Sequence, residues 1–519
     1  MKSLRRLTSL LIVLAVSAAL TACGGGKAQT DESEASLADS AESSEPTYGG
    51  SVTVGMTQEP VSLDPHVTTD AGTKNVVFNI YEGLVKATSD GDLEPAVASA
   101  YTISEDAMVY TFTLREGIVF HDGSAVTVDD VKYSIERYAE IQGESSALFY
   151  LDEVTVPDDE TIVVTLTEPN SELLAELTLA IIPESNDDPE GNPIGTGPFY
   201  VESYTAGVNI VLAKNEDYWK DGYPYLDEVT FKFDDDVDTA YMELLAGTID
   251  ILNYLTIDQV ESLSDDFTII TGSMNLVHAL YLNNDYEPLS DVRVRQALCY
   301  AVDRDEINDF LFGGESTLIG SSMIPSITKY YNEETADTYE YDIDAAKALL
   351  EEAGYGDGFD LVITVPSSYS QHVSTAEIIA DQLEEIGINV TIEQVEWTSW
   401  LSDVYTNRDY EATVVGVDAT LAPGDWFSRY RSDADNNFVN YSSDEFDALF
   451  DAAQLTVDED EKIEFYKQIQ QVLADDAASV YIEDPADFVA VNGDLCGYLF
   501  YPVSAQDMST VYYAQQQED

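Results

Sequence analysis

A strand, a helix and a second strand follow one another over residues 359–397, and this order constrains the fold more than any other feature. "FDLVITVP" has the apolar, β-branched character of a buried strand, and "INVTIEQVEW" alternates as a half-buried strand does. Between them, "STAEIIADQLEEIG" places its aliphatic residues on one helical face and ends at a glycine. We therefore expect a βαβ unit with parallel strands and a right-handed crossover, which places the chain among α/β proteins.

A second group of strands is predicted before residue 190. "MVYTFTLREG" alternates its apolar residues up to Gly117, and "DDETIVVTL" is a turn followed by a β-branched strand. One helix is expected at 128–138. Segment 86–190 therefore predicts a small mixed domain of its own, and a chain of 519 residues is long enough for about three domains.

The N-terminus has the composition of an export signal. Three basic residues precede an uncharged stretch, residues 7–22. This stretch is shorter than the roughly 20 residues that a bilayer-spanning helix needs, and it has the length of a signal-peptide core. Its end, Leu-Thr-Ala-Cys-Gly at 20–24, resembles the lipobox of bacterial lipoproteins. The resemblance implies cleavage of a signal peptide, residues 1–22, and a diacylglycerol on the Cys23 thiol.

Residues 23–47 predict a flexible tether. The stretch is rich in Gly, Ser, Ala and acidic residues and has no aromatic residue before Tyr48. Such a segment buries too little apolar surface to fold. We therefore expect a globular part, beginning at Tyr48, that is attached through Cys23 to the extracytoplasmic face of the cell membrane.

The chain is extremely acidic. Its 22 Lys and Arg residues face 99 Asp and Glu residues, which gives a net charge of −77. A field of this sign repels phosphate backbones, so nucleic acid is excluded as a partner. The acidity itself is typical of a protein that stays soluble in a demanding, salty medium.

The stretch "FHDGSAVTVDDVKYSIERY" is the strongest candidate for an active site, because His121 adjoins Asp122 and two more carboxylates follow. Local structure explains it better: Asp122 and Gly123 favour a turn, and Thr127 with Asp130 matches a capping pair at a helix N-terminus. The four histidines are not at metal-ligand spacing, and no phosphate-binding or nucleophile-elbow motif occurs. We expect no enzyme activity, no cofactor and no bound metal.

Several longer motifs occur in the order found in one family. They include "GGSVTVGMTQEPVSLDP", "NIYEGLVKATSDGDLEPAVASAYTI", "PIGTGPFYVESY", "LSDVRVRQALCYAVDRDEI" and "YSSDEFDALFDAA". From Tyr48 to about Pro485 the chain resembles the extracellular solute-binding proteins, family 5, of peptide and nickel ABC importers. The resemblance implies a two-lobed, type II periplasmic-binding-protein-like clamp with an extra domain inserted in lobe one.

The resemblance also implies where these parts lie. The implied parts are lobe one at 48–85, 191–275 and 486–519, the inserted domain at 86–190, and lobe two at 276–485. Two chain crossings, near 276–284 and 483–491, would form a hinge that closes the lobes over a ligand. A receptor of this kind binds and releases its ligand without covalent chemistry, acts as a monomer and delivers the ligand to ABC permease subunits.

Family geometry further implies which residues line the cleft. They are Gln58, Glu59, Tyr281, Asn283, Trp397, Trp400, Asp418, Thr420, Asp425 and Trp426. Trp397 offers an aromatic face to a side chain or a cation. For Tyr281 and Trp400, packing in a core explains the residue as well as ligand contact does.

One stretch departs from the family pattern. Peptide-binding members have a Gly-Trp pair followed by Asp-Tyr, whose aspartate binds the α-amino group of the peptide. This chain has Gly-Val at 416–417 and Thr-Leu at 420–421. Asp418 is the nearest replacement, with Asp425 and Trp426 as further candidates. We expect oligopeptides or dipeptides as ligands, and a metal chelate, an opine-like compound or an oligosaccharide stays open as the alternative.

Two further pairs of residues leave alternatives open. Cys299 and Cys496 are expected to be free thiols, although an exported protein permits a disulfide. Arg429 and Arg431 either anchor a ligand carboxylate or form surface salt bridges.

Overall fold

The computed structural model describes residues 46–67, 70–143, 146–234 and 236–515. The predicted signal peptide, Cys23 and most of the predicted tether lie outside the described residues. Strand β1 (Pro46–Thr47) pairs with strand β22 (Tyr512–Ala514). Regular structure thus begins inside the segment predicted as tether, because Pro46 and Thr47 complete a small sheet with the C-terminal strand and β21 (Leu495–Cys496).

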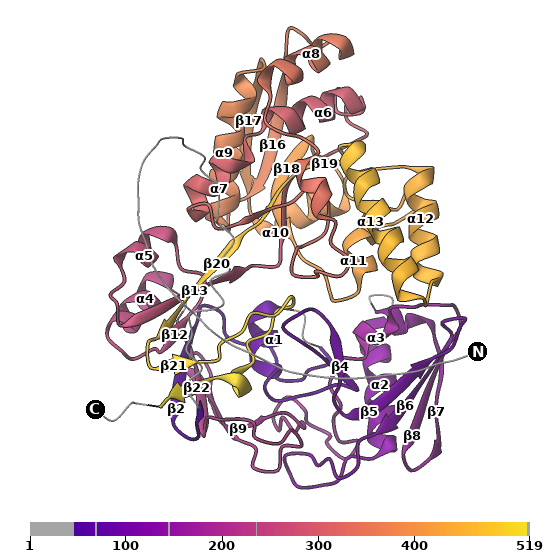
Figure 1. Cartoon of the computed structure of the whole chain (residues 1–519), viewed down its shortest axis with the longest axis vertical. Helices are drawn as coiled ribbons and strands as arrows, with labels where there is room; N and C mark the ends of the chain where they lie inside the picture. The colour runs from indigo at the N-terminus through magenta and orange to yellow at the C-terminus, as the bar shows by residue number, and fades with distance from the viewer. Residues whose placement is uncertain (1–45, 68–69, 144–145, 235, 516–519) are drawn as a thin grey trace, which may run out of the picture. The chain divides into compact units, whose positions relative to one another are not determined.

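One large sheet joins segments from the beginning, the middle and the end of the chain, and we call it and its helices lobe one (Figure 1). Its strand order is β13-β20-β12-β2-β11-β10-β9. The strands are β2 Ser51–Met56, β9 Phe199–Thr205, β10 Asn209–Lys214, β11 Glu228–Phe233, β12 Ile251–Leu252, β13 Phe267–Ser273 and β20 Ala486–Asn492. β2 runs parallel to β11 and β12, whereas β20 is antiparallel to β12 and β13. Alternate residues such as Val52 and Val54 pack into one core, as period-two strands require.

A smaller antiparallel sheet with its own core forms the inserted domain. Its order is β5-β6-β8-β7, next to the pair β3-β4. The strands are β3 Val85–Ala87, β4 Leu93–Pro95, β5 Ala98–Ile103, β6 Val109–Leu114, β7 Leu151–Asp158 and β8 Thr161–Leu166. Helix α2 (Val128–Gln142) packs on this sheet through Val131 and Ile135. The predicted capping pair is confirmed, since Thr127 and Asp130 each bind the backbone N–H of the other.

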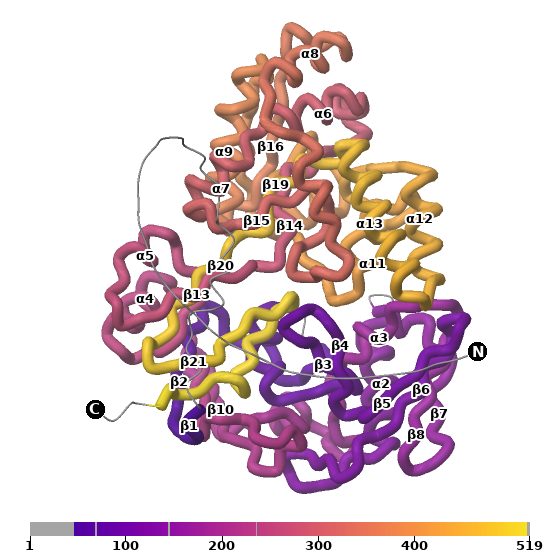
Figure 2. The backbone as a smooth tube through the Cα atoms, viewed as in Figure 1, coloured from indigo at the N-terminus to yellow at the C-terminus, as the bar shows by residue number. Residues whose placement is uncertain are grey.

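The second large sheet forms lobe two, and helices cover both of its faces (Figures 1 and 2). Its order is β15-β19-β14-β18-β16-β17, with β14 Val277–Leu282, β15 Thr317–Leu318, β16 Phe359–Pro366, β17 Ile388–Val395, β18 Ala412–Val417 and β19 Ser479–Asp484. The predicted βαβ unit is confirmed: β16 and β17 pair in parallel, and helix α9 (Ser370–Glu384) connects them. Successive residues Val414 and Val415 enter different cores, so β18 reads as a continuous apolar run.

The helices divide between the two faces of lobe two and the other parts. Helices of one face are α6 Val292–Ala301, α7 Arg304–Phe312, α8 Ile343–Ala353 and α9, and those of the other are α11 Pro423–Phe427, α12 Asp444–Leu455 and α13 Glu459–Asp475. The remaining helices are α1 Ala71–Val77, α3 Leu173–Glu176, α4 Val237–Leu245, α5 Ile257–Ser262 and α10 Trp397–Ser399, which continues as a π-helical segment to Thr406. Short 3₁₀ turns are at Ala147–Tyr150, Glu333–Asp337, Ser428–Tyr430 and Met508–Thr510. Within the described ranges, no helix combines the length and apolar character needed to cross a bilayer.

The chain passes between the two large sheets twice. β13 leads into β14 through residues 274–276, and β19 leads into β20 through Pro485. The crossings lie side by side, because the Met274 N–H donates to the Pro485 carbonyl (2.9 Å) and the Leu276 N–H donates to the Asp484 carboxylate (3.0 Å). Two short adjacent connecting segments therefore join the lobes, as in a hinge.

Candidate ligand-binding site

A cavity of about 280 Å³ lies between lobe two on one side and lobe one with the inserted domain on the other. One wall is the lobe-two loop 418–421 that follows β18. The opposite wall comprises parts of α1, α3 and β3 and the chain between α1 and β3. The charged lining residues are Lys74, Glu82, Lys86, Glu176 and Asp418, and those with hydroxyl groups are Tyr81, Tyr138, Thr178, Thr420 and Ser504.

The lobe-two wall belongs to the carboxyl edge of a parallel sheet segment. β16 runs parallel to both β17 and β18, so all three strands end at the same edge. The crevice outside such an edge is the usual ligand position in α/β proteins. Tyr369, Trp397 and Asp418 follow the three strands within a few residues, so the topology places all three at this edge.

The loop after β18 is held by its own hydrogen bonds. The Thr420 hydroxyl bonds to the Asp425 carboxylate, and the Trp426 Nε1–H donates to the Thr420 carbonyl (2.9 Å). The Arg429 guanidinium donates to the Asp418 carbonyl (3.1 Å). The Asp418 carboxylate itself is exposed at the cavity, and no other described residue forms a hydrogen bond or ion pair with it. The loop thus presents one unpaired carboxylate to a ligand.

The wall opposite Asp418 presents cations. Gly83 allows this wall to pack against the inserted domain, because a Cβ at that position would lie 2.5 Å from the backbone carbonyl carbon of Thr178. The close approach holds the segment that contains Glu82 and Lys86 at the cavity. Lys86 is buried, whereas Lys74 on α1 is exposed. Two ammonium groups therefore line the wall opposite Asp418.

A carboxyl group from the inserted domain completes the lining. Glu176 on α3 accepts a hydrogen bond from the Ser146 hydroxyl (2.7 Å). Burial raises the pKa of Glu176 above its ordinary value, although the bonds from Ser146 and Tyr138 act in the opposite direction. Glu176 therefore keeps its proton to a higher pH than an exposed glutamate does.

Four of the predicted ligand contacts lie in the core of lobe two instead of on the cavity surface. Tyr281, Trp400 and Trp426 are at most 2% exposed, and Asn283 is buried as well. Their polar groups have partners in the chain: the Tyr281 hydroxyl donates to the Val277 carbonyl (3.0 Å), and the Trp400 Nε1–H donates to the Thr413 hydroxyl (2.9 Å).

For Tyr281 and Trp400, this burial agrees with the core-packing alternative that the sequence left open. Tyr281 and Trp400 pack in the core, where a large aromatic side chain buries the most apolar surface. Asn283 donates to the Tyr410 carbonyl (2.8 Å) and so fixes the start of the neighbouring strand. Trp426 supports the loop that carries Asp418 from behind.

Of the other predicted residues, Asp418 and Thr420 line the cavity, whereas Gln58, Glu59, Trp397 and Asp425 lie outside its lining. Glu59 accepts hydrogen bonds from the Tyr204 hydroxyl (2.6 Å) and the Gly207 N–H (2.7 Å), which ties it to the β9–β10 hairpin, and Gln58 lies beside it in sequence. Trp397 is half-buried and stacks on Trp400, with ring centroids 5.0 Å apart. It shares the sheet edge with Asp418, so its contact with a ligand stays a prediction.

His121 occupies a structural position. Its Nδ1 accepts from the Gly195 N–H (3.2 Å) and its Nε2 lies 3.0 Å from the Gly197 carbonyl, so Nε2 carries the proton. Burial lowers the pKa of His121 to about 4, which keeps the ring neutral. Asp122 accepts from the backbone and hydroxyl of Ser124, as a turn residue does. These bonds join the inserted domain to the chain that returns to lobe one.

Two histidines that are 94 residues apart in sequence meet beside the hinge. His372 Nδ1 lies 3.2 Å from His278 Nε2, and His278 Nδ1 lies 3.5 Å from the Glu483 carboxylate. The spacing argument missed this pair because folding, not sequence proximity, brings α9 onto β14. The described residues contain no group of three His, Cys, Asp or Glu side chains suited to hold a metal ion.

A second cavity, of about 370 Å³, adjoins the first and shares Ala175 and Leu421 with it. Direct bonds between the inserted domain and lobe two border it. The Glu172 carboxylate accepts from the Gly424 N–H (2.9 Å) and from the Tyr466 hydroxyl (2.5 Å), and Lys462 Nζ donates to the Ser171 carbonyl (3.1 Å). These bonds hold the inserted domain against lobe two beside the second cavity.

The contacts in the structure distinguish between the alternatives for the two cysteines and for the two arginines. Cys299 and Cys496 are both free thiols. Arg431 forms ion pairs with Asp433 (3.1 Å) and Asp451 (2.9 Å), which is the surface salt-bridge alternative. Arg429 instead holds the Asp418 backbone.

Comparison with known proteins finds a matching family model and similar binding proteins. The family model described as "Bacterial extracellular solute-binding proteins, family 5 Middle" matches residues 92–438. The chain is 27% identical to the oligopeptide-binding protein AppA of Bacillus subtilis (strain 168), over 96% of this chain and 97% of that protein.

Two similar proteins have been solved in complex with different ligands. The ABC transporter-associated periplasmic binding protein DppA from Helicobacter pylori, in complex with the peptide STSA, is 28% identical with a TM-score of 0.73, over 90% of this chain and 99% of that chain. The binding protein AgaA from A. tumefaciens R10, in complex with agropinic acid, is 30% identical with a TM-score of 0.72, over the same shares. Similar chains of this fold thus hold a peptide in one case and a non-peptide solute in the other.

Proposed function

We propose that this chain, which belongs to the bacterial extracellular solute-binding proteins, family 5, captures dipeptides or oligopeptides. As a substrate-binding protein of an ABC importer, it would deliver them to the permease. The similarity to solved members confirms the predicted α/β fold, a two-lobed type II clamp. Its relatives are solute receptors rather than enzymes.

One observation carries the peptide proposal: the cavity has a carboxylate on one wall and ammonium groups on the other. Asp418 is unpaired within the described structure, and Lys74 and Lys86 line the opposite side. A short peptide with free termini has the complementary pair of charges. Asp418 would accept charge-assisted hydrogen bonds from the peptide ammonium group, in place of the family's Asp-Tyr aspartate. Thr420 and Trp397 are the neighbouring contacts that we propose on the same wall.

The size of the cavities supports a small ligand with room for extension. The first cavity lies just below the range of roughly 300–1,000 Å³ that is typical of ligand pockets. The second cavity continues past Ala175 and Leu421. We propose that the first cavity holds one end of the peptide and that longer peptides extend toward the second.

The alternative is a non-peptide solute that carries both charges. The sequence departs from the peptide-binding pattern at 416–421, and AgaA, a structure solved with agropinic acid, is 30% identical. Such a compound also fits a cavity with opposed charges. The two candidates differ in whether the ligand contains peptide bonds.

We further propose that hinge closure traps the ligand. The Glu172 bonds to Gly424 and Tyr466 join the inserted domain to lobe two, so opening of the lobes would break them. The two short crossings permit such a motion without disruption of either sheet. Binding of this kind is non-covalent and needs no catalytic residue.

The N-terminal sequence supports attachment to a membrane. The basic start, the uncharged stretch and the small residue before Cys23 together fit a lipobox. We propose that the chain works as a monomer, held by a lipid on Cys23 at the extracytoplasmic face, where it meets the permease.

Native mass spectrometry tests the proposal. The full chain is incubated with a pool of dipeptides to hexapeptides with free termini, and bound species are identified by mass after ejection. We expect intact, uncleaved peptides. If the peptide pool gives no adduct while a pool of non-peptide zwitterions does, the alternative replaces the peptide assignment. Peptides that are consumed and released as fragments would instead show an enzyme.

A further inference from the structure

Lys86 is an unusual lysine because it is only 9% exposed and yet lines the cavity. It lies in the middle of β3, which pairs with β4. Lysine side chains are almost never fully buried unless they are paired. The partners of the Lys86 ammonium group therefore decide what this residue does.

The ammonium group of Lys86 has charged neighbours but no hydrogen-bond acceptor among the described residues. The closest carboxylate oxygen, on Glu82, is 3.9 Å away, which exceeds hydrogen-bond distance. The Phe78 ring lies beneath the group, with its centroid at 4.5 Å. Neither neighbour accepts an N–H of the ammonium group in a hydrogen bond, so these donors are available to a ligand in the cavity.

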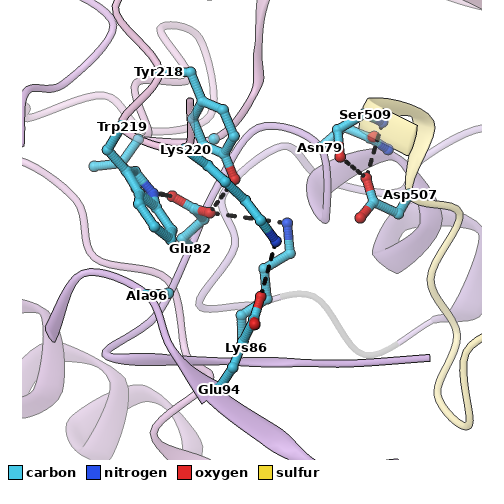
Figure 3. A network of polar contacts seen from close by, with 12 residues as sticks. Asn79, Glu82, Lys86, Glu94, Ala96, Tyr218, Trp219, Lys220, Asp507 and Ser509 are labelled. Carbon is cyan, nitrogen blue, oxygen red and sulfur yellow. Dashed lines mark hydrogen bonds and ion pairs between the residues drawn. The ribbon is translucent and has the colours of Figure 1, made fainter. Parts of the chain in front are cut away.

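Glu82 does not turn toward Lys86 because other donors occupy its carboxylate. The Trp219 Nε1–H and the Tyr218 hydroxyl each donate to it at 2.8 Å (Figure 3). The Thr196 hydroxyl also donates to it, at 3.1 Å. These bonds fix the Glu82 carboxylate within the wall. Lys86 thus receives a favourable field from Glu82 but no directed bond.

Asp507 acts on Lys86 in the same way. Its carboxylate accepts from the Ser509 N–H (2.9 Å), the Ser509 hydroxyl (2.6 Å) and the Tyr501 hydroxyl (2.8 Å). Burial alone would raise the pKa of Asp507, but the Lys86 charge and these hydrogen bonds lower it below its ordinary value. Asp507 is therefore ionised at neutral pH, and its own acceptor positions are occupied by these donors.

We propose that Lys86 is the anion anchor of the site and donates its N–H groups to a carboxylate of the ligand. This inference rests on the proposed function and names the part of the ligand that the wall opposite Asp418 recognises. Asp418 would hold the ammonium end, and Lys86 would hold the carboxylate end. Lys74 also lines the cavity, but its exposed ammonium group is screened by water and salt, so it contributes less.

The test compares free and amidated peptides on matched variants. One peptide without Asp or Glu, taken from the native mass-spectrometry experiment, is prepared with a free C-terminal carboxylate and with a C-terminal amide. Calorimetry measures both forms on the unmodified chain, on Lys86→Met and on Lys220→Met. Lys220 is the control because it belongs to the same network, bonded to Glu94 at 3.1 Å, but does not line the cavity.

Loss of one partner of a desolvated charge pair costs about 2–5 kcal/mol, so we expect amidation to weaken binding to the unmodified chain by about 30-fold or more. In Lys86→Met the free and amidated forms should bind within about 3-fold of each other, because the same interaction is already lost. Lys220→Met should keep the full difference between the two forms.

Several outcomes would overturn the anchor. Equal binding of both forms by the unmodified chain refutes it and leaves the peptide receptor intact, whereas absence of binding by either form refutes the proposed function itself. A large effect of amidation that persists in Lys86→Met would assign the carboxylate to another group. If Lys86→Met does not fold, Lys86→Gln takes its place, and the comparison of the two peptides on the unmodified chain still decides.

Discussion

Asp418 is the residue on which recognition of the ammonium end depends. Its carboxylate is unpaired at the cavity, and closure of the lobes would desolvate it around a bound peptide. Asp418→Asn keeps the shape but removes the charge, so we expect the affinity for a peptide with a free amino group to fall by about 30-fold, equivalent to about 2 kcal/mol. Calorimetry of the peptide identified by mass spectrometry measures the change.

A chemical control belongs to this prediction. N-acetylation of the same peptide should weaken its binding to the unmodified chain by a similar factor, and the acetyl group should add little loss in Asp418→Asn. Asp433→Asn serves as a matched variant, since Asp433 is an exposed aspartate paired with Arg431 away from the cavity. Full affinity of Asp418→Asn for the free peptide would rule out the ammonium contact.

At the residue scale, the sequence predicted local roles well and partners across the fold poorly. Asp418 was identified because it replaces a family position in the chain. Lys86 was not singled out, because nothing in "NIYEGLVK" shows that its lysine is buried beside Glu82. Tyr281 and Trp400 remained ambiguous because a large aromatic residue fits a core and a binding site equally well until its neighbours are known.

The hinge strands carry three buried carboxyl groups. Burial raises the pKa of Glu483 to about 8, and those of Asp484 and Asp487 to about 7. Each group keeps its proton in the folded chain at pH values where the unfolded chain has lost it. Their contribution to the free energy of unfolding is therefore fully present below about pH 4 and is lost as pH rises toward 7–8. Burial lowers the pKa of His278 to about 4, so its contribution is lost in the opposite direction, as pH falls below about 6.5.

Glu483→Gln should remove one of these proton linkages. Relative to the unmodified chain, the variant should gain about 1.4 kcal/mol of unfolding free energy per pH unit between about pH 5 and 8. Urea unfolding at a series of pH values measures the difference. Glu153→Gln, at an exposed position on β7, is the control and should leave the pH dependence unchanged. Parallel curves for Glu483→Gln and the unmodified chain would show that Glu483 titrates normally.

At the scale of elements, the sequence predicts the helices and strands whose formation depends on residues that are close together in the chain. The βαβ unit follows from the hydrophobic period of its residues. The caps of α8 are local as well, with Asp342 at the N-cap and Gly354 at the C-cap, where φ is 90°, a value that suits glycine. The cavity could not be located in this way. It forms where helices, a strand and loops from distant parts of the chain meet, and only Gly83 hints at the close approach that places Lys86 there.

For the whole molecule, the membrane anchor is the first claim to test. Cys23→Ala removes the thiol that would carry the lipid, so we expect loss of metabolic labelling with a radioactive fatty acid and release of the chain from the membrane fraction. Cys299→Ala is the control, because that thiol is buried in lobe two and should leave labelling unchanged. Labelling that survives in Cys23→Ala would contradict the anchor.

The central claim is that a peptide binds between the lobe-two loop 418–421 and the opposite wall of the cavity, which contains Lys86. Hydrogen–deuterium exchange on the full chain, with and without the peptide identified by mass spectrometry, tests it most directly. We predict slower exchange in the loop 418–421 and in the segment 81–87 together, with no change at the His121 turn, 120–124. A peptide that binds while one of the two walls, or both, exchanges as before would contradict the account.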